Sequence, residues 1–106
     1  MSKIVLNYED KEYELEFNRQ SVKMMESQGF VLDEITSKPM TMIPLLFSGA
    51  FIKNCRGTKR SVIDDIFDGI ADKTSLMQAL MEMYAETLST LTDDVSEGNV
   101  SWTLVK

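Results

Sequence analysis

The sequence predicts an α+β fold in which an N-terminal antiparallel β-hairpin packs against about four α-helices. Two patterns support this prediction. Residues 3–17 alternate between apolar and polar side chains with a period of two, which is typical of half-buried strands. Later stretches repeat apolar residues every three or four positions, which is typical of amphipathic helices. A chain of 106 residues with 43% hydrophobic residues suits one domain with a modest core.

The hairpin is predicted from two short runs that meet at Glu9-Asp10-Lys11. In the second run, Tyr13, Leu15 and Phe17 share one face of the strand. The glutamates Glu12, Glu14 and Glu16 share the other face, where we expect them to meet water and to discourage pairing with another copy. Because an isolated hairpin is only marginally stable, its apolar face must pack on the helices.

Helices are expected at about 19–27, 42–54, 61–69 and 75–91. Each has a candidate N-cap: Asn18 for the first, Thr41 for the second, Thr58 or Ser61 for the third, and Thr74 or Ser75 for the fourth. Gly29 suits the left-handed position that ends the first helix.

The second helix is predicted to be the central and most buried one. Its broad apolar stripe comprises Ile43, Leu46, Phe47, Ala50 and Phe51. We expect Pro44 to lie in its first turn, where proline is tolerated. The small residues 48–50 leave the helix narrow on one side, where a neighbouring backbone could approach. Its contact with residues 76–91 is predicted to be the main helix–helix contact.

Residues 1–92 are predicted to form a single globular domain, followed by an acidic linker and strand-like segment over 93–106. In that segment Val100, Trp102 and Leu104 alternate with Ser101 and Thr103. The strip could join the hairpin as a third strand, or it could stay free and add a strand to the sheet of a partner. The sequence leaves both alternatives open.

The composition argues against an enzyme. The chain has no histidine and one cysteine, so histidine acid–base chemistry, a Cys–His pair and a thiolate zinc cage are excluded. We expect no catalytic residue, no cofactor and no metal site, and we interpret Cys55 as a small hydrophobic residue at the end of a buried helix. The side chains of Asp64, Asp65, Asp68 and Asp72 are interpreted as a solvated helix face, because one helix rarely supplies converging metal ligands.

The formal net charge of −6 disfavours binding to nucleic acid, whose phosphates require neutralising cations. The apolar stretch over 42–52 is interrupted and too short to cross a membrane. A free cysteine and an N-terminus without an export signal predict a cytoplasmic protein.

Three groups of residues are candidates for contact with a protein partner. The basic group either places cations near the C-terminal end of the second helix, which we favour, or contacts an acidic partner. The two methionines either fill the edge of the core, which we favour, or form a pliable binding surface. The candidates are Lys53, Arg56, Lys59 and Arg60; Met77 and Met81; and Val100, Trp102 and Leu104.

An ordered set of segments resembles the small tail assembly chaperones of long-tailed, siphovirus-type phages and prophages. The segments are KEYELEFN, SVKMMESQGF, KPMTMIPLLFSGAFIKN and TKRSVIDDIFDGIADKTSLMQALMEMYAETLSTL, which cover residues up to about 92. The resemblance implies a non-enzymatic protein that holds the aggregation-prone tape-measure protein and helps to recruit tail-tube subunits in the host cytoplasm. It also implies that the protein can form homo-oligomers and that a longer, frameshifted form can exist.

Two other functions remain open. One is a structural phage protein, such as a tail-completion or head–tail connector subunit. The other is a small cytoplasmic protein–protein adaptor unrelated to phage. In all of these readings the apolar helical stripes serve packing and protein binding.

Overall fold

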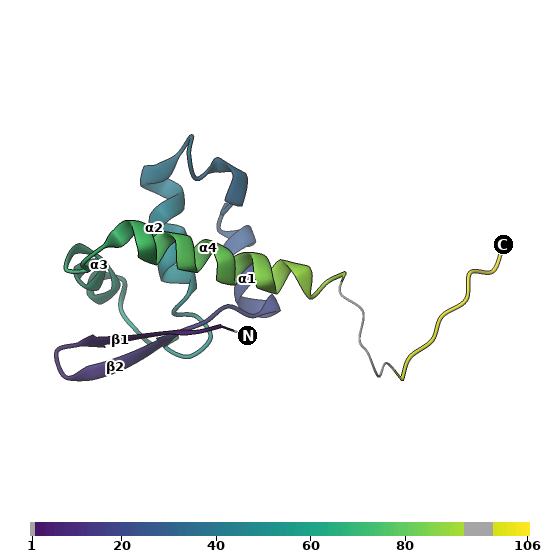
Figure 1. The fold of residues 1–106 in the computed structure, drawn as a ribbon, viewed down its shortest axis with the longest axis horizontal. Coiled ribbons are helices and arrows are strands. Elements are labelled where there is room, and N and C mark those ends of the chain that lie inside the picture. The colour runs from purple at the N-terminus through teal and green to yellow at the C-terminus, as the bar shows by residue number, and fades with distance from the viewer. Residues whose placement is uncertain (1, 93–98) are drawn as a thin grey trace.

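The computed structural model describes residues 2–92 and 99–106 and confirms the α+β fold. Figure 1 shows the hairpin with the helices stacked on one side of it. The elements in chain order are β1 (Ile4–Tyr8), β2 (Lys11–Leu15), α1 (Arg19–Ser27), the 3-10 helix η1 (Leu32–Glu34), α2 (Pro39–Gly49), α3 (Arg60–Asp68) and α4 (Lys73–Ser89).

The hairpin follows the predicted alternation. Strands β1 and β2 pair antiparallel, with Leu6 opposite Tyr13 and Tyr8 opposite Lys11. Glu9 and Asp10 form the two-residue turn with φ angles of 50° and 62°, a conformation that hairpin turns favour. The side chains of Tyr13, Leu15 and Phe17 are buried against the helices, while the glutamates between them are exposed or half-buried.

Helix α1 begins and ends as the sequence predicts. The Ser21 amide donates to Asn18 Oδ1 over 2.7 Å, and the Asn18 amide donates to Ser21 Oγ over 2.9 Å, which completes a capping box. Gly29 follows the helix with a φ of 98°, a left-handed value that glycine adopts without strain.

Helix α2 differs from its predicted bounds of 42–54. It begins at Pro39, after Lys38 rather than Thr41, because proline at the first helical position needs no amide partner. Pro44 therefore lies inside the helix, not in its first turn. The helix ends at Gly49, and residues 50–54 continue as turns, with Phe51 donating to Ser48 O and Ile52 to Gly49 O.

The narrow side of α2 is filled by a side chain, not by the neighbouring backbone that the sequence suggested. Met25 of α1 is fully buried and lies against Gly49. A Cβ atom at position 49 would come within 2.6 Å of Met25 Cγ, so a larger residue there would force the Met25 side chain to move.

The caps of the last two helices also differ from expectation. Helix α3 begins at Arg60 after Lys59, which makes no side-chain capping bond, so neither Thr58 nor Ser61 caps it. Helix α4 begins at Lys73 and is capped by Asp72, whose side chain accepts from the Ser75 amide over 3.3 Å. Asp72 adopts a left-handed φ of 56°, which aspartate tolerates better than most residues.

The core lies between the hairpin and the helices, with α2 at its centre. Helix α2 contacts α1, α3, α4 and η1. Its contact with α4 is present as predicted, but α1 packs against it at least as extensively. Aromatic rings link the layers, since Phe51 contacts Tyr13 of β2 and Phe47 of α2, with ring centroids 5.9 and 5.2 Å apart.

The C-terminal segment extends away from this body (Figure 1). Among the described residues the sheet contains only β1 and β2, so 99–106 does not form the third strand that was one of the two alternatives. The linker predicted over 93–99 lies, except for Asn99, outside the described residues. No helix within 2–92 or 99–106 is long and apolar enough to cross a membrane.

Candidate functional site

An apolar groove lies between α2 and α3 and encloses about 370 Å³. This volume is within the range of about 300–1,000 Å³ that is usual for binding pockets. Seven of its lining residues are apolar and two are acidic. They are Pro39, Met40, Ile43, Pro44 and Phe47 from α2, and Ile63, Asp64, Phe67 and Asp68 from α3.

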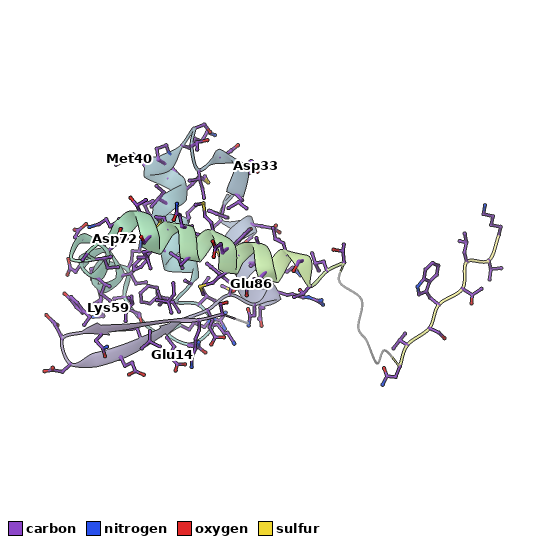
Figure 2. All side chains as sticks on the ribbon, viewed as in Figure 1. Glu14, Asp33, Met40, Lys59, Asp72 and Glu86 are labelled. Atoms are coloured by element: carbon purple, nitrogen blue, oxygen red, sulfur yellow. The ribbon has the colours of Figure 1, made fainter. Side chains whose placement is uncertain are left out.

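The floor of the groove is made of packed, buried side chains, whereas one wall is exposed. Phe47 is buried, and its ring centroid is 5.1 Å from that of Phe67. Ile63 is buried beside them. Met40, by contrast, is 89% exposed at the N-terminal end of α2, far from the hairpin (Figure 2). An unbranched methionine in this position can adjust its shape to an apolar group that enters the groove.

Pro44 interrupts the hydrogen bonding of the same wall. Proline has no amide hydrogen, so the carbonyl of Met40, four residues earlier in the helix, lacks its helical donor.

The aspartates give the groove an acidic edge. Asp64 and Asp68 are exposed, and Arg60 Nε lies 3.3 Å from Asp64 Oδ1 in an exposed ion pair. Asp65 and Asp72 are also exposed, as expected for a solvated face. Within the described parts of the chain, no three histidine, cysteine or acidic side chains are placed to hold a metal ion.

The predicted basic group lies elsewhere, along the connection between α2 and α3. Lys53 Nζ is 3.0 Å from Glu16 Oε2, and Arg56 Nη2 is 3.5 Å from Met24 Sδ. Because α2 ends at Gly49, no basic residue lies in its last turn, and Lys53, the first of the group, comes four positions later. Lys53 instead ties this connection to Glu16, just after β2, and Arg56 ties it to Met24 of α1. Arg60 pairs with Asp64 within α3.

A polar hollow of about 540 Å³ lies beside this connection. It is bounded on one side by Lys11, Glu12 and Tyr13, and on the other by residues 54–59 and Val62. Lys59 and Arg56 line it, but Glu12 is also at its rim, so the charge that an acidic ligand would meet is mixed. Cys55 is half-buried here, with Sγ 3.6 Å from the carbonyl oxygen of Glu14.

Hydrogen bonds in this connection also perturb one carboxylate. Asn54 Nδ2 donates to Glu16 Oε1 over 2.8 Å, and Lys53 donates to Oε2. These two bonds, with that of Asn54 the larger cause, lower the pKa of Glu16 below its ordinary value. This anion supports the structure, because both of its oxygens are already engaged by the protein.

The other predicted residues separate into two groups. Met77 and Met81 of α4 are half-buried against the core, in agreement with the edge-of-core interpretation. The residues of the terminal strip remain exposed: Val100 by 86%, Trp102 by 85% and Leu104 by 69%. The basic group, the two methionines and the terminal strip therefore lie in different places and do not form one site.

Sequence reasoning missed the groove itself. It assigned Ile43 and Phe47 to one buried stripe, and it did not consider Met40 or Phe67 as surface features. A signal was present, because residues 39–47 are apolar on nearly all sides of the helix. A short helix of this kind has more apolar surface than one packed face can cover.

Comparison with known proteins supplies a family but not a function. The model of the family described as "Domain of unknown function (DUF5055)" matches residues 1–105. No curated protein and no solved structure shows a significant match to the chain.

Proposed function

We propose that this chain, which belongs to the DUF5055 family, is a non-enzymatic chaperone that binds an apolar helical segment of another protein in the groove between α2 and α3. The observation that carries this proposal is an apolar, open groove whose wall includes the 89% exposed Met40. Apolar side chains that line a concave groove are a common mark of a binding site.

The shape and chemistry of the groove suit a helix. Two helices form its walls, and an amphipathic helix can insert apolar residues spaced three or four positions apart between them. The flexible, exposed side chain of Met40 allows partners of different sequence to fit. Asp64 and Asp68 at the rim favour a helix that carries lysine or arginine beside its apolar stripe.

The resemblance to phage tail assembly chaperones suggests which proteins the partner helix belongs to. We propose that the bound segments belong to the tape-measure protein, the tail-tube protein or both, during tail assembly in the cytoplasm of the bacterial host. A tape-measure protein is a long helical chain with apolar repeats, which is the kind of surface that the groove fits. The net charge of −6 would keep such a complex in solution.

The same groove supports a binding role over a catalytic one. Its only ionisable lining residues are Asp64 and Asp68, and both are exposed to solvent. Catalytic carboxylates are usually withdrawn from solvent, which these two are not. The proposed activity is therefore to keep a partner soluble, without chemistry.

Co-expression tests the proposal. The chain would be produced together with the tape-measure and tail-tube proteins encoded beside it, and the soluble, co-purified amount of each would be measured. Met40→Glu places an unpaired charge in the groove without touching the core, and we expect at least a roughly tenfold loss of retained partner.

A matched control separates the groove from a general effect of added charge. Leu91→Glu adds the same charge at an apolar position that is 67% exposed and does not line the groove. It should retain the partner as the unmodified chain does. The proposal fails if the unmodified chain retains and solubilises neither partner, or if Met40→Glu and Leu91→Glu behave alike.

A further inference from the structure

The outer edge of β1 presents backbone groups that no other described residue satisfies. The sheet has two strands, so β1 has a partner on one side only. Tyr8 and Lys11 flank the two-residue turn and therefore form a hydrogen-bonded pair. Since such pairs alternate along an antiparallel ladder, Leu6–Tyr13 is also bonded, whereas the amides and carbonyls of Val5 and Asn7 point outward.

The two edges of this hairpin differ. The outer edge of β2 is covered by the connection after α2, because Asn54 Nδ2 and Cys55 Sγ both approach the carbonyl of Glu14, at 3.5 and 3.6 Å. Neither Val5 nor Asn7 has a comparable backbone bond within the described residues. An open edge of this kind is a template for another strand.

The C-terminal segment has the complementary pattern. Val100, Trp102 and Leu104 alternate with Ser101 and Thr103, as in a strand with one apolar and one polar face. These apolar side chains are among the most exposed in the described structure, from 69% to 86%. The radius of gyration is 16.1 Å, compared with about 13 Å expected for a compact chain of this length, because the segment leaves the body.

We propose that residues 99–106 of one copy pair with the β1 edge of a second copy, adding a third strand to its sheet. Each chain carries both the strand and the edge, so one symmetric contact can satisfy both. Within its own chain the segment is directed away from the hairpin, which leaves its own β1 edge open to the other copy (Figure 1).

The side chains on the two faces of the segment are compatible with this pairing. With Val100, Trp102 and Leu104 on the face of Ile4, Leu6 and Tyr8, the apolar row would extend the core layer of the hairpin. Ser101 and Thr103 would then lie on the outer face beside Val5 and Asn7. That face also holds Glu12 and Glu14 of β2, and residues 99–106 carry no acidic side chain that would repel them.

Proline substitution on the edge tests the pairing without breaking the hairpin. Val5→Pro removes an outward amide hydrogen but none that bonds to β2, and proline is accepted at such edge positions. Val5→Thr keeps the amide and is the matched control. In sedimentation measurements over a concentration series, we expect the unmodified chain and Val5→Thr to associate, and Val5→Pro to associate at least roughly tenfold more weakly.

The single tryptophan gives a second, independent readout. As the unmodified chain associates, emission from Trp102 should move to shorter wavelength, because the side chain leaves water for an apolar face. Val5→Pro should keep the emission of an exposed tryptophan at the same concentrations. Far-ultraviolet circular dichroism would establish that both variants remain folded.

Complementation identifies the two halves of the contact. Val5→Pro keeps the C-terminal segment able to pair but blocks the β1 edge. The double variant Ser101→Pro with Thr103→Pro keeps the β1 edge but prevents the C-terminal segment from pairing. Each should be monomeric alone, and a mixture should form a dimer with one exchanged strand.

Three results would overturn the inference, and none depends on the groove function proposed above. The first is a monomeric unmodified chain whose tryptophan emission does not change with concentration. The second is equal association by Val5→Pro and Val5→Thr. The third is association that Met40→Glu abolishes and Val5→Pro does not, which would place the strip in the groove between α2 and α3.

Discussion

On one face of α2, Met42 and Leu46 are buried and Gly49 lies against Met25, whereas on the opposite face Met40, Ile43 and Pro44 line an open groove. We call these the core face and the groove face. Both are apolar, so composition does not distinguish them. The difference comes from their neighbours: α1 and α4 cover the core face, while the nine-residue α3 covers only part of the other. One helix can thus supply stability on one side and an uncovered binding surface on the other.

The largest expected effect tests this division by truncating one residue on each face. Leu46 is fully buried, so Leu46→Ala should lower the free energy of unfolding by about 2–5 kcal/mol. Met40→Ala should change it by less than about 0.5 kcal/mol, because the side chain is already in water. Denaturant unfolding of both variants measures the difference. Equal losses would show that the groove face also supports the fold.

The next effect concerns the close approach on the core face. Gly49→Ala would place a Cβ atom within 2.6 Å of Met25 Cγ, so we expect a loss of about 1–3 kcal/mol in the free energy of unfolding. Gly57→Ala is the matched control, because a Cβ there meets nothing within 4 Å. Adding Met25→Ala to Gly49→Ala should reduce the penalty of the glycine substitution, and additive losses would contradict the proposed contact.

These two faces also show what the sequence could predict. Local features were accessible: the capping box of Asn18, the left-handed Gly29 and the alternation that buries Tyr13 and Leu15 depend on neighbours a few residues away. Features that depend on tertiary packing were not. The groove is apolar surface of α2 that α3 does not cover. The sequence of α2 alone does not indicate how far the neighbouring helices extend along it.

The errors in helix ends have equally local physical causes. Pro39 starts α2 because proline suits the first helical position, and Lys38 supplies no side-chain cap that could have marked it. Asp72 caps α4 from a left-handed backbone conformation. The sequence did not suggest this role, because Asp72 was interpreted with the preceding aspartates as part of a solvated face. The terminal strip was open to two interpretations, because an alternating pattern predicts a strand but does not say which sheet the strand joins.

Helix capping offers a smaller test of the same comparison. Helix α1, which packs on the core face, has a complete capping box, whereas α3, beside the groove, has no side-chain cap. Asn18→Ala should therefore cost about 1 kcal/mol of unfolding free energy. Lys59→Ser should add a cap to α3 and stabilise the protein by a few tenths of a kcal/mol up to about 1 kcal/mol. Thermal unfolding of both variants measures these changes, and a destabilised Lys59→Ser protein would contradict the assignment.

The smallest effect concerns the connection between α2 and α3, where Asn54 and Lys53 hold Glu16. Their hydrogen bonds lower the pKa of Glu16 in the folded state, so the anion stabilises the fold above its ordinary pKa of about 4.3. This stabilisation is lost as the pH falls through the lowered folded-state value. Near neutral pH, Glu16→Gln should cost about 0.5–1 kcal/mol, a range set by the partial exposure of the ion pair.

Unfolding measured from neutral to acid pH should therefore show the unmodified chain and Glu16→Gln converging as Glu16 becomes protonated. Glu12→Gln is the matched control, because Glu12 is an exposed glutamate of β2, four residues before Glu16. Its stability should stay close to that of the unmodified chain near neutral pH. A gap between Glu16→Gln and the unmodified chain that persists unchanged in acid would mean that shape, and not charge, holds the connection. In that case the connection between α2 and α3 would be fixed by packing alone, and its position would not respond to pH.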